Sequence, residues 1–430
     1  MKIALFIRNL AGVVGGAERA ALSMAGAMTA RGHQASIVTH ERAAAPPHYP
    51  VPDGVTLVRL GAAVETSPPD PRPDAPSNAP SDARAVPPRR APRRTKARPL
   101  RALAKRLEIE SRPLRAGVWS LRNRTVVRDL ADWLARERPD VAIAFLPTIT
   151  PHLAAALQRV PTPSVLAFRN EPDYVLTASP GDLDGALRAR WMRDALGRFD
   201  RLTVLAPQYL DQLPETVRDR ALYIPNEVDV PQFAAARATP LLERPRRILF
   251  VGRLERQKRP ALLLEAFASI AERAPDWRVG LFGAGAEELT LRASAERLGL
   301  SDRIDFHGVV SDMPAAYRSG QIICAPSAVE GFPRALSEAM AAGLAPVGFE
   351  SCVGVANLLR DGAGRLAPEG DGSVASLANN LADALETVLD DGVRAAAAAA
   401  AARRAAEFTP TSVFDAWEEL LRSLAARRQG

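Results

Sequence analysis

The 430-residue sequence has little cysteine and few aromatic residues. Its two cysteines, Cys324 and Cys352, lie in apolar sequence surroundings and supply neither a disulfide framework nor the ligand spacing of a metal site. No apolar run approaches the roughly 20 residues that cross a bilayer. The first residues lack the apolar stretch and the small-residue cleavage site of a secretory signal. We therefore expect a cytoplasmic protein that uses no metal and no cofactor.

Lysine is also scarce, with 4 residues against 52 arginines, although the net charge is +7 and the sequence pI is about 9.9. The positive charge is concentrated in one segment. Residues 84–128 hold 15 Arg or Lys and two acids, a net charge of +13, so the rest of the chain carries −6. The overall basicity is therefore a property of this segment, and the remaining chain is mildly acidic.

The basic residues 89–128 admit three interpretations: a solvated helix, a nucleic-acid patch, or a surface that binds anionic lipid. Each basic residue near an anionic membrane contributes about 1 kcal/mol, and an apolar helical face adds to that. Aromatic residues for base stacking are absent except Trp119, which disfavours single-strand binding. We favour an anionic membrane surface, on the inner face of the membrane, and expect no nucleic acid. The apolar residues recur at spacings that roughly fit one helical face: Leu100, Leu103, Leu107, Ile109, Leu114, Val118 and Leu121.

Strand and helix patterns alternate along most of the chain. Residues 2–8 read as a strand, followed by a glycine-bearing loop, a helix from about 17 to 30, and a strand at 34–39. Such a unit predicts parallel strands with right-handed crossovers. The alternation continues to residue 224 and restarts with a strand at 247–251. The sequence thus predicts the α/β class, with two Rossmann-like, doubly wound domains facing a cleft.

The predicted domain limits follow from this pattern and from composition. We expect an N-terminal domain over 1–228, which includes a flexible Pro/Arg-rich insertion at about 61–100 and a basic helical segment at about 99–134. The C-terminal domain covers 229–410. Residues 411–430 form an amphipathic helix that packs back on the N-terminal domain. Ligands of such sheets bind at the carboxyl ends of the strands, which here face the cleft.

The strongest chemical signal is the phrase Glu330-Gly331-Phe332-Pro333-Arg334-Ala335-Leu336-Ser337-Glu338, which follows an apolar strand. A helix is expected to begin near Pro333 and to end at Gly343. Its N-terminus presents free N–H groups and a partial positive charge, which suit a diphosphate. Two carboxylates beside a diphosphate would be repelled by it unless they bound other groups. Sugar and ribose hydroxyls, from which they can accept hydrogen bonds, are such groups. The alternative is an ordinary amphipathic helix with a capping acid.

The second signal is Gly252-Arg253-Leu254-Glu255-Arg256-Gln257-Lys258, directly after the strand at 247–251. Fixed cations can stabilise the charge that develops on a departing nucleoside diphosphate without a metal. Lys258 is the only lysine in the second half of a chain that otherwise uses arginine. This choice favours a compact ammonium at that position. A solvated basic loop is the alternative.

Together the two phrases resemble the retaining GT-B glycosyltransferases whose signature is two glutamates separated by seven residues, the family 4 or group 1 glycosyltransferases. The resemblance covers most of the chain apart from residues 61–100 and extends to a branch that builds bacterial surface polysaccharides or lipid-linked glycans. It implies transfer, with retention, of a hexose or N-acetylhexosamine from a UDP- or GDP-linked sugar to a glycan or lipid-linked acceptor hydroxyl. The alternative is a non-catalytic, nucleotide-sugar-binding or membrane-associated partner protein with the same fold.

The resemblance implies that the domain over 1–228 is the acceptor side and that the domain over 229–410 binds the nucleotide sugar. It also implies roles for particular residues. Arg253 and Lys258 would grip the donor phosphates, Glu330 would contact sugar hydroxyls, and Glu338 would contact the ribose. Arg253, Lys258 and Glu330 form the implied catalytic group. Further implied donor contacts are Gly15, Gly16, Gly283, Val309, Gly331, Phe332, Pro333, Arg334, Ala335 and Leu336.

The predicted acceptor side consists of Arg169, Asn170 and Asp173, which follow an N-domain strand. Many members of the family carry a histidine here that touches the donor sugar, and this chain has Arg169 instead, so that role is not carried over. A turn with capping polar groups explains the phrase equally well. A second departure lies at 224–227, where the family's I-P-N-G phrase reads I-P-N-E.

Overall fold

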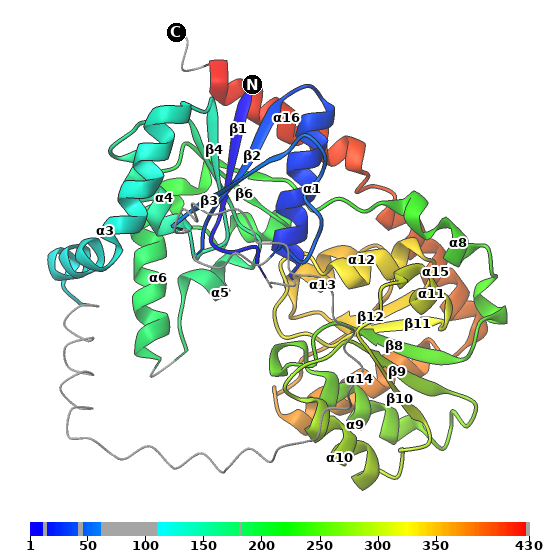
Figure 1. Cartoon of the computed structure of the whole chain (residues 1–430). Coiled ribbons are helices and arrows are strands. Elements are labelled where there is room, and N and C mark those ends of the chain that lie inside the picture. The colour runs from blue at the N-terminus through cyan, green and yellow to red at the C-terminus, as the bar shows by residue number, and fades with distance from the viewer. Residues whose placement is uncertain (12–14, 42–45, 62–109, 180–181, 427–430) are drawn as a thin grey trace, which may run out of the picture.

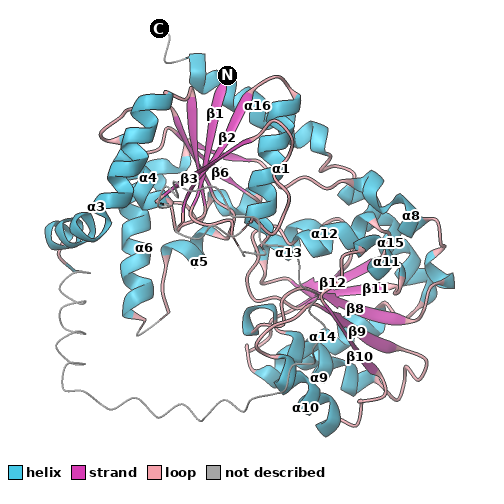
Figure 2. Cartoon of the chain, viewed as in Figure 1, coloured by secondary structure: helices cyan, strands magenta, loops and turns pink. Residues whose placement is uncertain are grey.

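The computed structural model describes residues 1–11, 15–41, 46–61, 110–179 and 182–426. It contains two parallel sheets, each flanked by helices (Figure 1, Figure 2). We call the parts built on these sheets the N-terminal and C-terminal domains. The predicted class, two Rossmann-like α/β domains, is confirmed. The predicted insertion at 61–100 and most of the basic residues before 110 lie outside the described residues.

The N-terminal sheet has seven strands in the order β3-β2-β1-β4-β5-β6-β7. The order reverses beside β1, so the carboxyl ends of β1 and β4 open a crevice of the kind that binds ligands in such sheets. The strands are β1 (Lys2–Ile7), β2 (Gln34–His40), β3 (Thr56–Leu60), β4 (Val141–Phe145), β5 (Ser164–Ala167), β6 (Arg201–Val204) and β7 (Ala221–Tyr223).

Side chains of β1 alternate between two helical layers, as the period of a strand requires. Ala4 and Phe6 belong to one core cluster, and Ile3, Leu5 and Ile7 to another. The first cluster includes side chains of α3 (Arg112–Glu137), α4 (Thr150–Leu157) and α6 (Leu183–Leu196). The second includes α1 (Gly16–Ala30) and α16 (Pro410–Ala426). Short helices α5 (Pro172–Leu176) and α7 (Glu215–Arg218) complete the domain.

The C-terminal sheet has six strands in the order β10-β9-β8-β11-β12-β13. They are β8 (Arg247–Val251), β9 (Arg278–Phe282), β10 (Ile304–Gly308), β11 (Ile322–Ala325), β12 (Ala345–Phe349) and β13 (Arg365–Ala367). The sequence pattern did not reveal β13, because three residues are too few to show a period. The helices are α8 (Ala234–Arg237), α9 (Pro260–Ile270), α10 (Glu288–Arg297), α11 (Met313–Arg318), α12 (Arg334–Ala341), α13 (Val353–Leu359), α14 (Val374–Thr387) and α15 (Asp391–Ala405).

Helix α12 begins one residue later than predicted. Pro333 has ψ 99°, an extended conformation, and precedes the helix instead of forming its first turn. The helix ends as expected near Gly343, whose φ is +81°. There the N–H of Gly343 donates to Met340 O and that of Leu344 to Ala339 O, both at 3.0 Å, which is the Schellman pattern that favours glycine.

Helix α16 lies last in the chain but packs on the N-terminal sheet beside α1 (Figure 1). Its Trp417 and Leu421 are buried against that sheet. The chain therefore crosses back between the domains after α15, and the C-terminal segment helps to hold the two domains together.

Leu421→Ala is expected to destabilise the protein by about 2–5 kcal/mol, because it opens a cavity in a fully buried position. The matched variant Leu289→Ala, at a side chain that is 82% exposed, should change stability by no more than about 0.5 kcal/mol. Urea denaturation of the two variants measures this difference. Equal midpoints would contradict the packing described for α16.

Candidate active site at the domain interface

A cavity of about 470 Å³ lies between the two domains. It is formed by Gly15 and the first turn of α1, the loops after β4, β5 and β7, the loop after β8, and the segment from β11 into α12. These are carboxyl ends of parallel strands, where ligands of doubly wound sheets bind. Its lining includes Gly15, Gly16, Glu18, Arg19, Tyr49, Arg169, Asn170, Asn226, Gly252, Arg253, Gln257, Lys258, Glu330, Gly331, Phe332, Arg334, Ala335 and Glu338.

Glu330 is held from three sides. The Nζ atom of Lys258 forms an ion pair with its Oε1, and Ser327 Oγ donates to the same oxygen at 2.9 Å. The hydroxyl of Tyr209, from the N-terminal domain, donates to the main-chain carbonyl of Glu330. The Lys258 and Glu330 side chains are only 23% and 13% exposed. An ammonium is thus fixed beside the start of α12, within the same cavity.

The start of α12 has no side-chain cap. The first N–H groups of any helix lack intrahelical partners, and here the first two residues of the helix, Arg334 and Ala335, line a cavity that Lys258 also lines. An uncapped helix N-terminus and a fixed cation are the two features that favour an oxyanion. The cavity can therefore accept a phosphate group between them.

Arg253 lies at the rim of the cavity. Its Nη1 contacts Glu255 Oε1 at 2.8 Å, and the side chain is 58% exposed. The loop that carries it is fixed by a close backbone approach: a Cβ on Gly283 would lie 2.0 Å from the carbonyl oxygen of Gly252. Arg253 and Glu330 therefore share one cavity, but their side chains are paired with different partners in this structure.

Glu338 bridges the two domains. Its Oε1 accepts a hydrogen bond from Arg19 Nη1 of α1 at 2.8 Å, and its Oε2 accepts one from Tyr317 OH at 3.1 Å. The residue is 8% exposed. Because both carboxylate oxygens are engaged, a ligand hydroxyl that binds Glu338 must share or displace one of these donors.

The two departures from the family pattern form one network. Arg334 Nη2 donates to Glu227 Oε1 at 2.8 Å, and Arg169 Nη1 donates to Asn226 Oδ1 at 2.8 Å. Burial alone would raise the pKa of the Glu227 carboxyl, but the Arg334 guanidinium outweighs that effect and leaves the pKa below its ordinary value. Glu227, where the family often has glycine, therefore neutralises a buried arginine across the domain interface.

Arg169 is fully enclosed. Its guanidinium lies 4.8 Å from the ring centre of Phe145 and 5.5 Å from that of Trp417, and burial lowers its pKa to about 10. The stacking connects α16 to the floor of the cavity. Asn170 also lines the cavity, whereas Asp173 lies in the first turn of α5 and lines neither this cavity nor the larger one beside it.

Most of the predicted donor residues come together, but four do not line the cavity. Gly283 packs against the backbone of Gly252 instead of lining the cavity. Val309 is 76% exposed. Leu336 points into the core at 1% exposure. Pro333 precedes the helix without lining the cavity. Spacing within a motif cannot tell which side of a helix or loop faces the ligand.

The residues that orient the two glutamates were not predicted from the sequence. Tyr209 and Tyr317 hold Glu330 and Glu338, and Glu18 and Tyr49 line the cavity. Burial raises the pKa of Glu18. The two tyrosines and Tyr49 come from separate elements and carry no local pattern, whereas Glu18 closely follows the predicted contacts Gly15 and Gly16. The I-P-N-E phrase is a signal for Glu227, since a buried acid in place of a glycine requires a cation nearby.

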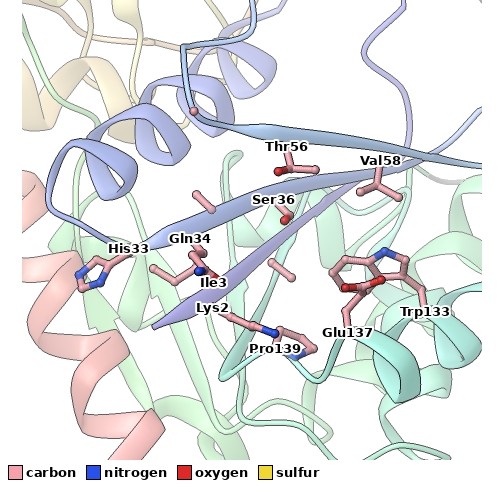
Figure 3. Close-up of a pocket in the computed structure, with 13 residues that line it drawn as sticks. Lys2, Ile3, His33, Gln34, Ser36, Thr56, Val58, Trp133, Glu137 and Pro139 are labelled. Atoms are coloured by element: carbon pink, nitrogen blue, oxygen red, sulfur yellow. The ribbon is translucent and has the colours of Figure 1, made fainter.

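A further cavity of about 360 Å³ lies near Lys2, Gln34 and Thr56, the first residues of three strands (Figure 3). It is at the amino ends of the strands, opposite to the end where ligands of this fold bind. Within the described ranges, we find no group of three His, Cys, Asp or Glu side chains that could hold a metal. No helix in those ranges is long and apolar enough to cross a membrane.

Two doubly wound domains around an interdomain cleft define the GT-B class, and comparisons with known proteins agree. The family model described as glycosyl transferases group 1 matches residues 232–405, and the model described as glycosyl transferase 4-like domain matches residues 15–227. The chain is 34% identical over 272 residues to phosphatidyl-myo-inositol mannosyltransferase of Mycobacterium tuberculosis, covering 62% of this chain and 68% of that one. The chain therefore belongs to the glycosyl transferases group 1 family.

Solved structures show the same fold. Sucrose-phosphate synthase from Thermosynechococcus elongatus superposes with a TM-score of 0.72 at 20% identity and covers 99% of each chain. Anabaena HepE, in complex with UDP and glucose, superposes with a TM-score of 0.65 at 18% identity over 98% of this chain and 100% of that one. In the first curated relatives, however, the chain spans about a quarter to two thirds of the relative's length.

Glu227→Gln is expected to destabilise the protein at neutral pH by about 3–5 kcal/mol, because it leaves the buried Arg334 without its carboxylate. A carboxyl whose pKa is lowered by folding stabilises above its unfolded pKa of about 4.3 and loses that contribution as the pH falls through its folded pKa. The difference between variant and wild type should therefore shrink below pH 4. Denaturation curves at pH 7 and pH 3.5 measure it.

Glu255→Gln is the matched control, since Glu255 pairs with the exposed Arg253 and such pairs contribute about 0–1 kcal/mol. A Glu227→Gln variant that is as stable as this control at pH 7 would contradict the buried ion pair across the interface.

Proposed function

We propose that this protein is a retaining glycosyltransferase that moves a hexose or N-acetylhexosamine from a UDP- or GDP-linked sugar to the hydroxyl of a glycan or lipid-linked acceptor. One observation carries the proposal. The uncapped start of α12, Lys258, Arg253 and the two glutamates Glu330 and Glu338 line a single cavity between the domains. The solved structure of HepE with UDP and glucose, which has the same fold, supports a nucleotide-sugar ligand.

In this proposal the diphosphate lies at the start of α12, with Lys258 beside it. When the glycosidic bond to the diphosphate breaks, negative charge grows on the leaving phosphate. A fixed ammonium, the Arg253 guanidinium and the helix N–H groups stabilise that charge without reorganising. In this proposal the two cations and the helix N–H groups stabilise the leaving phosphate in place of a metal ion.

The glutamates would position the donor. Glu330 accepts hydrogen bonds from sugar hydroxyls, and Glu338 accepts them from the ribose. Diphosphate binding competes with Glu330 for Lys258, so the ammonium turns from one anion to the other. No carboxylate is proposed as a covalent nucleophile. The acceptor hydroxyl attacks from the side of the leaving phosphate, which takes its proton, and the anomeric configuration is retained.

The acceptor side of the proposal is supported by a relative whose name specifies a lipid acceptor, phosphatidyl-myo-inositol. The described part of the basic segment supports an enzyme that acts at a membrane surface. On α3, Leu121 is 79% exposed, and Arg122, Arg124 and Arg128 are exposed beside it. Basic and apolar side chains on one helix favour binding to an anionic bilayer. We propose a cytoplasmic enzyme that associates peripherally with the membrane.

Lys258→Ala is expected to weaken UDP or GDP binding about 10- to 100-fold, because a hydrogen bond between charged groups contributes about 1.5–3 kcal/mol. Transfer should fall further, by about 10²–10³-fold, since the charge is greatest in the transition state. Isothermal titration with UDP and GDP, followed by a transfer assay with the nucleotide sugar that binds, measures both effects.

Lys2→Ala is the matched control: Lys2 is the other lysine among the described residues and lies at the far, amino end of the sheet. Equal nucleotide affinity in the two variants would overturn the proposed diphosphate site. Nucleotide binding with no transfer to any acceptor would favour a non-catalytic partner protein instead. An inverted product, read from the anomeric proton coupling by NMR, would overturn retention alone.

A further inference from the structure

A larger cavity, of about 710 Å³, lies within the N-terminal domain. Arg8, Thr148 and Asn170 place it at the carboxyl ends of β1, β4 and β5. Helices α3, α4 and α6 enclose it on one side of the sheet (Figure 1). Asn170 lines this cavity and also the cavity between the domains. The two cavities therefore adjoin at Asn170.

Part of the wall of this cavity is apolar and aromatic, and polar residues such as Arg122, His152 and Arg188 form the rest. Trp119 of α3 and Trp191 of α6 lie on it, with Met192 and Val175 nearby. Tyr174, also on the wall, is 54% exposed. Aromatic and aliphatic side chains that line a cavity of this size favour a ligand with a hydrocarbon part.

Two buried donors on the same wall have no partner among the described residues. They are Nη1 of Arg8 and Nε1 of Trp191. A buried N–H without an acceptor costs about 1–3 kcal/mol, and buried polar groups in folded proteins are otherwise almost always hydrogen-bonded. Arg8 and Trp191 both line this cavity, so a ligand with acceptor oxygens bound there can satisfy the two donors.

Arg8 also lacks a charge partner. No ion pair with a carboxylate is found for it in the described residues, and burial lowers the pKa of its guanidinium. The acid on this wall, Asp182, is engaged, because it accepts a hydrogen bond from the Gly185 N–H at 2.8 Å and caps α6. A half-buried cation without an anion is costly. An anionic group bound in the cavity would neutralise the Arg8 guanidinium.

Building on the proposed function, we infer that this cavity binds the acceptor and that the acceptor is an amphipathic phosphate. Its phosphate oxygens bind Arg8 and the Trp191 N–H, and its hydrocarbon chain lies along the Trp119–Trp191 wall. The part of the acceptor that carries the reacting hydroxyl extends past Asn170 to the donor sugar. The lipid-linked acceptor is thus recognised inside the domain, in addition to any contact of α3 with a bilayer.

The test uses three probes: farnesyl phosphate, farnesol and inorganic phosphate. Trp119 and Trp191 lie on the wall, so binding is followed by the change in tryptophan fluorescence of the full chain, without any transfer assay. Farnesyl phosphate should bind at least about tenfold tighter than farnesol, and inorganic phosphate should bind more weakly than either. Equal affinity of farnesol and farnesyl phosphate would overturn the inference, and so would phosphate binding as tightly as the phosphorylated lipid.

Arg8→Gln should remove the preference for farnesyl phosphate and leave farnesol binding unchanged. Trp191→Phe, which keeps an aromatic ring but loses the N–H, should reduce the preference severalfold and checks the result if Arg8→Gln folds poorly. Arg193→Gln, at an exposed position of the same helix, is the control for charge. A preference that persists in both Arg8→Gln and Trp191→Phe would contradict the inference.

Nucleotide binding separates this inference from the proposed function. Arg8→Gln should bind UDP or GDP as wild type does, because Arg8 does not line the donor cavity. Farnesyl phosphate binding that depends on Arg8, in a protein that binds no nucleotide, would support the lipid-phosphate site and overturn the donor site. Nucleotide binding that depends on Lys258, without a preference for the phosphorylated lipid, would do the reverse.

Discussion

The ion pair between Lys258 and Glu330 is the interaction on which the site depends. It joins the loop after β8 to the loop that leads into α12, and so brings a cation to an uncapped helix start. An isolated ammonium with only 23% of its side chain exposed would be costly, and the carboxylate offsets that cost in the absence of a ligand. A diphosphate can replace the carboxylate as the partner of the ammonium. Glu330 therefore neutralises Lys258 when no ligand is bound and keeps it in position to bind one.

The N-terminal domain fixes this arrangement through contacts that cross the cleft. Tyr209 holds the carbonyl of Glu330, Arg19 holds Glu338, and Glu227 neutralises Arg334. Glycine permits the close approach: a Cβ on Gly331 would lie 2.6 Å from the carbonyl oxygen of Arg169. The geometry of the donor cavity is therefore a property of both domains, and a movement between them would alter every one of these contacts.

The sequence predicted the elements that have a period and a motif. Strand β1, with apolar residues on both faces, and helix α12, with its Gly343 stop, are examples. It could not predict partners distant in the chain, such as Tyr317 for Glu338 or Trp417 for Arg169, because no spacing encodes them. It also placed Leu336 and Val309 at the site, since a motif does not show which face of an element is turned toward a ligand. The glutamate at position 227 is explained by its ion pair with Arg334, a residue distant in the chain that the sequence does not place beside it.

The most direct test of the account is a crystal structure of the protein with UDP, or with GDP if that nucleotide binds more tightly. The account predicts the β-phosphate within hydrogen-bond distance of Lys258 Nζ and of the first backbone N–H groups of α12, with Lys258 no longer paired to Glu330 alone. A pyrophosphate bound elsewhere, with the Lys258–Glu330 pair unchanged, would contradict it.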